Sequence, residues 1–265
     1  MAEKQYQTRQ SEKGLSPMIA PEQPRLIVLE GIDLSGRTTQ VQLLHDWLLA
    51  QRYRVTTTAW RTSPLISDIL IRARNGPMLR PLTYSLLYSA DHFDRTQRVI
   101  KPALARGEIV LADRYTYTAF ARDSARGLDL AWVQNVYHYS VQPDIVFYLH
   151  ISPAEAVKRR VALQQQRLQT LHKDMPAGKQ GKAGKDTKDA KKSRKPDKAS
   201  LPVVAPIPAL AGEALESFHD FEMKMYAEYQ QMQKTFGFTV IEGSQPIDQV
   251  QAMLRRAVMR LLLNI

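Results

Sequence analysis

The chain has 265 residues, of which 44% are apolar, and it contains no cysteine. Without cysteine it can form neither disulfides nor thiolate-bound metal sites, and redox catalysis through sulfur is excluded. The net charge of +11 suggests an anionic partner, but residues 173–198 hold ten Lys or Arg against four Asp and so supply six of those charges.

Residues 1–24 are polar, and we expect them to form a disordered tail. They lack the continuous apolar stretch of a secretory signal. No segment reaches the roughly 18 apolar residues that a membrane-crossing helix needs. We therefore expect a soluble, cytoplasmic protein.

Five short apolar runs are typical of buried strands. They comprise residues 26–29, 55–60, 109–112, 145–149 and 238–241. Helical periodicity is expected at about 36–51, 64–74, 82–105 and 129–140, from Ser152 onward, and at 246–262. Strands that alternate with helices predict an α/β fold with a five-stranded parallel sheet, and ligands then bind at the carboxyl ends of the strands.

Residues 169–212 break this alternation. They are rich in Lys, include the string GKQGKAGKDTKDAKKSRKPDK and end in a proline-rich stretch. Such a composition cannot bury enough apolar surface to offset the entropy lost on ordering. We interpret the segment as a disordered insertion in a single domain of residues 25–265, with a solvated linker favoured over a nucleic-acid or polyanion site.

The string GIDLSGRT, residues 31–38, lies between the first predicted strand and the first predicted helix. It follows the GxxxxGK[ST] pattern of P-loop NTPases, with Arg37 at the lysine position. Such a loop wraps phosphates with backbone N–H groups, and the hydroxyl of Thr38 suits Mg²⁺. The alternative is a glycine-containing turn that holds no ligand. Arginine keeps the positive charge but is planar and larger than lysine.

Asp113-Arg114-Tyr115 ends the third predicted strand. It should emerge at the same edge of the sheet as the phosphate loop. Asp113 can hold a water bound to Mg²⁺, and Arg114 can pair with a phosphate in a bidentate way. Seen alone, the pair would be structural about as often as functional.

Four strings together resemble thymidylate kinases: LIVLEGIDLSGRTTQ, LLYSADHFDRTQRVIKPALARGEIVLADRY, QPDIVFYLHISPAEAVKRR and SFHDFEMKMYAEY. The resemblance covers about residues 25–168 and 214–263. It implies a core, an acceptor region and a mobile lid. It also implies transfer of the γ-phosphoryl group of ATP to a nucleoside monophosphate with Mg²⁺, most simply dTMP, in nucleotide biosynthesis. A homodimer is implied by the same analogy.

The resemblance also implies roles for individual residues. The ATP phosphates are expected to contact Gly31, Leu34, Ser35, Gly36, Arg37, Thr38 and Thr39. The acceptor nucleotide is expected to contact Asp33, Arg61, His92, Arg114, Thr118 and Arg122. Thr38 and Asp113 would bind Mg²⁺, partly through water. Catalysis is expected from Arg37, Asp113, Arg114, Arg159 and Arg160.

The sequence departs from the family pattern around the acceptor. His92 replaces an arginine that usually reaches the thymine, and Arg122-Asp123 replaces a common Tyr-Gln pair. Leu34 leaves the loop without an arginine, so a transition-state cation must come from the lid, from Arg159, Arg160 or Arg167. Tyr88 and Phe93 are favoured as core residues over base-stacking ones.

These departures leave a second hypothesis open, a degenerate kinase-like protein that binds a nucleotide with weak turnover or takes a different acceptor. An Arg37→Lys change is informative here. It raises activity if the enzyme is merely impaired, and it leaves activity unchanged or lower if the site is built for arginine.

Overall fold

The computed structural model describes residues 24–75, 79–174 and 212–264. A sheet of five parallel strands forms its centre, in the order β2-β3-β1-β4-β5. The strands are β1 (Arg25–Glu30), β2 (Val55–Ala59), β3 (Ile109–Asp113), β4 (Ile145–His150) and β5 (Thr239–Glu242). The predicted α/β fold with a P-loop-type parallel sheet is therefore confirmed.

The register of β1 against β3 places the two chemical motifs at one edge. Leu29 pairs with Asp113, so both strands end at the same level of the sheet. The phosphate loop leaves β1 just beyond this point, and Arg114 follows β3 there. The main-chain N–H of Arg114 also donates to the Leu29 carbonyl at 3.0 Å.

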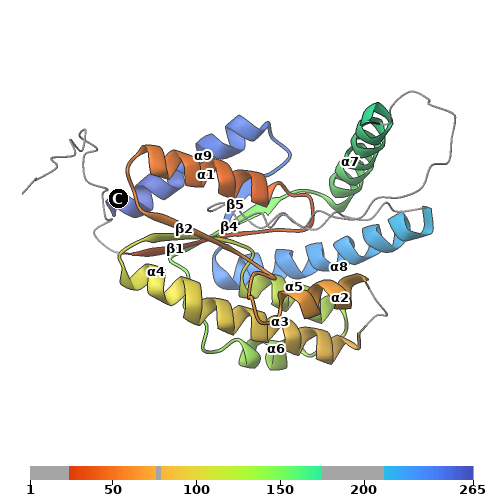
Figure 1. Cartoon of the computed structure of the whole chain (residues 1–265), viewed down its shortest axis with the longest axis horizontal. Helices are drawn as coiled ribbons and strands as arrows, with labels where there is room; N and C mark the ends of the chain where they lie inside the picture. Colours follow the sequence, from red (N-terminus) through yellow and green to blue (C-terminus); the bar gives the residue numbers. More distant parts are fainter. Residues whose placement is uncertain (1–23, 76–78, 175–211, 265) are drawn as a thin grey trace, which may run out of the picture.

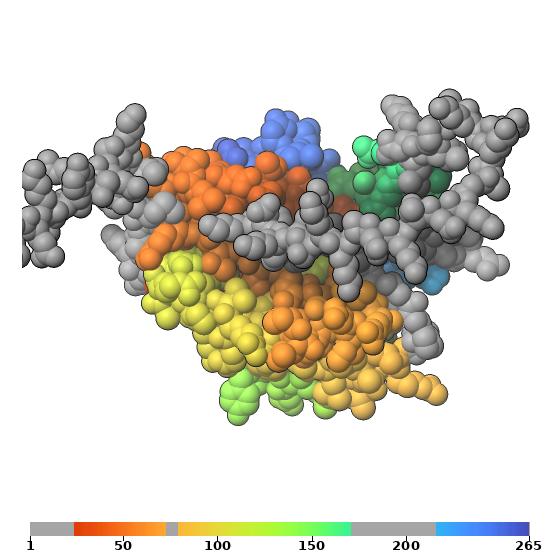
Figure 2. All heavy atoms as spheres, in the orientation of Figure 1, coloured from red at the N-terminus to blue at the C-terminus, as the bar shows by residue number. Residues whose placement is uncertain are grey.

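Helices cover both faces of the sheet (Figure 1). One face is covered by α1 (Arg37–Ala50) and α9 (Ile247–Leu263), and α3 (Pro81–Arg95), α5 (Thr116–Ala125) and α8 (Gly212–Phe236) lie on the other. The remaining helices are α2 (Ser67–Asn75), α4 (Lys101–Ala105), α6 (Leu130–Val136) and α7 (Pro153–Asp174). In the space-filling view, α1 and α9 lie above, and α2, α3 and α6 lie below (Figure 2).

The apolar side chains of β1 alternate between two cores, because successive residues of a strand point to opposite faces. Ile27 and Leu29 pack with the α1 and α9 side chains, whereas Leu26 and Val28 pack with α3, α5 and α8. All four are essentially inaccessible to water. A central strand buried on both faces is what its unbroken apolar run predicts.

Two helices were not predicted. α8 carries the periodic residues Phe221, Met225, Tyr229 and Met232, so its signal was present in the sequence. α5 lacks a strong local signal, because most of its residues are polar, β-branched or aromatic. Its first turn is stabilised instead by a side chain of β1, which is described with the site.

Other boundaries shift modestly. The predicted helix at 82–105 consists of α3, a π-helical stretch at Thr96–Ile100 and α4. α7 begins with the predicted cap, since Glu155 N donates to Ser152 Oγ at 3.1 Å. α7 also includes residues 169–174, which the sequence placed in the insertion.

The rest of the predicted insertion up to residue 211, and the predicted tail up to residue 23, lie outside the described residues. The single-domain organisation therefore stays a prediction. Within the described ranges, no helix is long and apolar enough to cross a membrane.

Gly31, the first residue after β1, provides a test of this packing. Its φ is 145°, and a Cβ there would lie 2.6 Å from the carbonyl oxygen of Leu149. We expect Gly31→Ala to lower the free energy of unfolding by about 3 kcal/mol, from backbone strain plus the clash. Urea denaturation measures this change.

Gly127→Ala is the matched control. Gly127 also has a positive φ, 87°, but a Cβ there would meet nothing within 4 Å. It should cost only about 1 kcal/mol of strain. Equal losses at the two glycines would show that the close approach to Leu149 is not as described.

Candidate active site

A cavity of about 1050 Å³ opens at the carboxyl ends of the central strands. One end is formed by the phosphate loop, residues 33–38, and by residues 243–247 after β5. The other end is formed by aromatic and arginine side chains from α3, α5 and the segment after β2. The site therefore lies where a parallel sheet of this type is expected to bind ligands.

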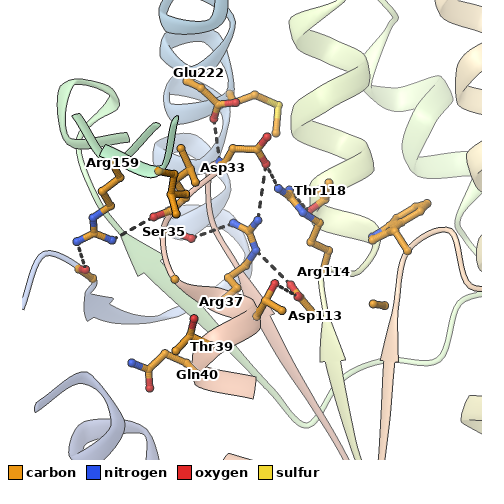
Figure 3. A pocket seen from close by; sticks show the side chains of 18 of the residues that line it. Asp33, Ser35, Arg37, Thr39, Gln40, Asp113, Arg114, Thr118, Arg159 and Glu222 are labelled. Atoms are coloured by element: carbon orange, nitrogen blue, oxygen red, sulfur yellow. Dashed lines mark hydrogen bonds and ion pairs between the residues drawn. The ribbon is translucent and has the colours of Figure 1, made fainter. Parts of the chain in front are cut away.

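Arg37 is folded into the interior of the phosphate loop (Figure 3). Its Nη1 donates to the carbonyl oxygens of Gly31 and Ile32, and to Ser35 Oγ at 2.9 Å. The side chain is 6% exposed. All three contacts are made by this one nitrogen, so one arm of the guanidinium is held against the loop.

The two flanking carboxylates also face this guanidinium. Nη2 of Arg37 lies 3.8 Å from Asp33 Oδ1, and Nε lies 3.4 Å from Asp113 Oδ1. Asp33 pairs in addition with Arg114 Nη2. The structure thus brings together four predicted residues at the N-terminus of α1: Asp33 bridges Arg37 and Arg114, and Asp113 pairs with Arg37.

Arg114 has an unusual backbone conformation for a residue other than glycine. Its φ is 74°, in the left-handed region. This conformation directs the side chain toward Asp33 and lets Nη1 reach Thr118 Oγ1 at 3.3 Å. Strain of about 1–3 kcal/mol at such a residue is typical of functional sites.

Thr38 and Asp113 fit the magnesium role that the family resemblance implies. Thr38 Oγ1 donates directly to Asp113 Oδ2, so a hydroxyl and a carboxylate meet at the start of α1. Mg²⁺ prefers such hard oxygen ligands, usually one or two carboxylates together with waters and phosphates. The side chains present therefore suit this ion.

Arg159 and Arg160, both predicted as catalytic, lie differently. Arg159 Nε bonds Glu155 at 2.9 Å, Nη1 donates to the Leu34 carbonyl at 3.1 Å and Nη2 to the Gly243 carbonyl at 2.9 Å. It therefore links α7, the phosphate loop and the segment after β5. Among the described residues, the cavity wall includes Arg159 but not Arg160, whose guanidinium lies 5.2 Å from the Phe218 ring.

Arg61 reaches the cavity from a loop that Asp91 holds in place. Asp91 is fully buried and accepts the main-chain N–H of Arg61 at 2.8 Å and that of Ser63 at 3.0 Å. Arg61 has a φ of 65°, another left-handed residue. The predicted acceptor residue is thus positioned by a carboxylate of α3 that the sequence did not indicate.

Arg122 lies at the aromatic end of the cavity. Its Nε and Nη2 donate to Asp123 at 2.7 and 3.0 Å, and Ser85 Oγ donates to the same carboxylate at 2.6 Å. The guanidinium lies 4.0 Å from the centroid of the Tyr88 ring and 5.4 Å from that of Trp60. A cation held so firmly has little freedom to adapt to a poorly fitting ligand.

Arg126 adds a second cation on this side, 4.1 Å from the centroid of the Tyr84 ring. Burial raises the pKa of Tyr84, but the charges of Arg122 and Arg126 outweigh it, so the pKa of Tyr84 is lowered. Tyr84 and Tyr88 both line the cavity, and Tyr88 also belongs to the buried core, the role favoured for it from the sequence.

His92 is not part of the cavity wall formed by the described residues. It is fully buried, packs against Tyr115 and Tyr137, and bonds Ser140 Oγ at 2.8 Å. Burial, aided by Arg95, lowers the pKa of His92 well below its usual value, so it is neutral. The structure thus places His92 in the core, where it packs against Trp60, a residue that does line the cavity, and its role at the acceptor stays a prediction.

Glu30, the last residue of β1, was missed by the sequence analysis. Its fully buried carboxylate accepts from the main-chain N–H groups of Tyr115 and Thr118 at 2.7 and 3.1 Å. It also accepts from Thr118 Oγ1 at 2.6 Å and from the Tyr229 hydroxyl at 2.7 Å. Thr118 lines the cavity, but its hydroxyl mainly connects Glu30, Arg114 and Tyr229.

Comparison with known protein families shows which family the chain matches. A sequence model of thymidylate kinases matches residues 29–178, which include the phosphate loop, Asp113-Arg114 and α7. The chain belongs to the thymidylate kinase family. The family resemblance inferred from the four strings is thereby confirmed.

Relatives named as thymidylate kinases come from archaea and bacteria. The chain is 42% identical over 134 residues to the probable thymidylate kinase 2 of Saccharolobus solfataricus, a match that spans 51% of this chain and 62% of that protein. It is 35% identical over 142 residues to the probable thymidylate kinase of Thermococcus kodakarensis, spanning 50% and 69%. It is 33% identical over 153 residues to the thymidylate kinase of Thermoanaerobacter sp. strain X514, spanning 55% and 74%. The match to the first of these thus spans less than two thirds of its length.

Proposed function

We propose that this protein transfers the γ-phosphoryl group of ATP to a nucleoside monophosphate, with dTMP as the acceptor. One observation carries the proposal: Asp33, Arg37, Asp113 and Arg114 meet at the N-terminus of α1, in the wall of a cavity of about 1050 Å³. Membership of the thymidylate kinase family supports it.

The chemistry assigned to the protein is positioning and charge neutralisation, since phosphoryl transfer requires little covalent chemistry from the enzyme. Main-chain N–H groups of residues 33–38 and the N-terminus of α1 bind the phosphates of ATP. Arg37 and Arg114 neutralise the negative charge of these phosphates. Thr38 and Asp113 would hold Mg²⁺, which would supply further neutralisation of the phosphate oxygens.

The acceptor occupies the aromatic end of the cavity, and Arg61 pairs with its phosphate. Tyr88 and Trp60 offer ring surfaces against which a base can pack. Arg122 offers charged N–H donors, which match the keto oxygens of thymine and not the amino group of cytosine. We assign base recognition to Arg122 in place of His92, whose side chain is in the core.

A second candidate is a nucleotide-binding protein with weak turnover. The position of Arg37 favours it, because its guanidinium is bonded to the Gly31 and Ile32 carbonyls, contacts that compete with a phosphate for the same cation. The homodimer implied by the family resemblance stays a prediction.

Base selection gives the first test. With Mg·ATP and a panel of nucleoside monophosphates, we expect ADP release to be fastest with dTMP and at least about tenfold slower with dCMP. Arg122→Lys keeps the charge but loses the fixed fork, so the dTMP/dCMP ratio of kcat/KM should fall by about tenfold. The ratio is insensitive to any loss of folded protein.

Arg98→Lys is the matched control, because Arg98 is exposed and pairs only with Asp94 of the same helical stretch among the contacts described. Its dTMP/dCMP ratio should equal that of the wild type. Absence of turnover with every acceptor, together with measurable binding of Mg·ATP, would favour the weak-turnover candidate instead.

Arg37→Lys gives the second test. Because several loop oxygens and two carboxylates surround the arginine fork, we expect lysine to lower kcat/KM by at least about tenfold, equivalent to about 1.4 kcal/mol. Arg52→Lys, at the exposed end of α1, should change nothing. A rise in activity with Arg37→Lys would instead show that arginine impairs the enzyme.

A further inference from the structure

Glu222 of α8 is a buried carboxyl group at the phosphate end of the cavity. It is 2% exposed, and its Oε2 accepts the main-chain N–H of Asp33 at 2.9 Å. Figure 3 shows it directly beside the loop, next to the side chain of Asp33. The carboxyl thus holds the main chain of Asp33, while the side chain of Asp33 pairs with Arg114 and Arg37.

The charges around Glu222 come from every element that packs on this part of α8. Asp33 faces it from the phosphate loop, Arg37 from α1 and Arg114 from the end of β3. On the neighbouring turns of α8, Arg126, the residue after α5, lies over Phe221, and Arg160 of α7 lies over Phe218.

The protonation of Glu222 follows from this setting. Burial and the nearby Asp33 carboxylate raise the pKa of Glu222 to about 8, although the N–H of Asp33 and the two arginines oppose the shift. At neutral pH the group is therefore mostly a neutral acid. It still accepts the Asp33 N–H, and it leaves Arg37 and Arg114 without a further competing anion.

We propose that Glu222 is a proton-dependent positioning residue, which fixes the phosphate loop against α8 and takes up a proton when nucleotide phosphates bind beside it. This inference rests on the proposed function, because it takes the ligand of the loop to be a nucleotide. The juxtaposition that carries it is a buried carboxyl bonded to the main chain of the loop and lining the same cavity.

Electrostatics determines the direction in which phosphate binding shifts the pKa of Glu222. Phosphates are anionic, so their binding disfavours the ionised form of Glu222 and raises its pKa further. The complex then binds more protons than the free protein at pH 8–9. Nucleotide affinity consequently falls as the pH rises through the pKa of Glu222, by up to about tenfold for each unit by which binding raises that pKa.

Calorimetric titration with Mg·ATP at pH 8.5, in two buffers of different ionisation enthalpy, measures this proton uptake. Phosphate groups, whose second pKa is about 6, are fully ionised there, so the nucleotide contributes little. We expect the wild type to take up a fraction of a proton. Its affinity should fall severalfold to tenfold between pH 7 and pH 9.5.

Glu222→Gln keeps an acceptor for the Asp33 N–H and is neutral at every pH. It should take up no proton, and its affinity for Mg·ATP should fall little between pH 7 and pH 9.5. Glu228→Gln is the control on the same helix, at a half-buried glutamate whose pKa burial also raises. Its proton uptake should equal that of the wild type.

Two results would overturn the inference: wild-type binding at pH 8.5 with no proton uptake, or equal uptake by the wild type and Glu222→Gln. The first needs no variant, so it decides even if the glutamine protein does not fold. Neither result contradicts the proposed function. The proposed function fails if the wild type binds no Mg·ATP at pH 7.

Discussion

Glu30 is the residue on which the arrangement of the site depends. Its carboxylate receives two main-chain N–H groups from the start of α5 and two hydroxyl groups, one from α5 and one from α8. Burial raises its pKa, and these hydrogen bonds oppose the shift. Because a buried acceptor with four donors has one favourable position, the end of β1, the turn after β3, α5 and α8 are fixed relative to one another.

The functional groups follow from that framework. β1 continues directly into the phosphate loop, and the turn that Glu30 binds carries Arg114. Asp33 and Arg37 then meet Arg114 and Asp113 at this edge of the sheet. α8 adds Glu222, which ties the loop from its other side. The two buried glutamates thus hold the phosphate site between the sheet and α8.

The sheet, the phosphate loop and the Asp113-Arg114 pair could be predicted, because continuous apolar runs and glycine spacing are local signals. α5 could not, since the group that bonds its first main-chain N–H groups is Glu30, far away in sequence. His92 was expected at the acceptor, but in the structure it is fully buried against Trp60 and Tyr137, which are distant in the sequence. The role of Glu222 depends on a contact between α8 and the loop that no spacing in the sequence reveals.

The most direct test of the central role of Glu30 is to measure the stability and the nucleotide affinity of a Glu30→Leu protein. The change removes the acceptor of the Tyr115 main-chain N–H and of the Thr118 and Tyr229 hydroxyl groups, all of them buried. We predict that the free energy of unfolding falls by at least about 3 kcal/mol, and that the folded protein binds Mg·ATP at least about tenfold more weakly. Unchanged stability together with unchanged affinity would contradict the central role of Glu30.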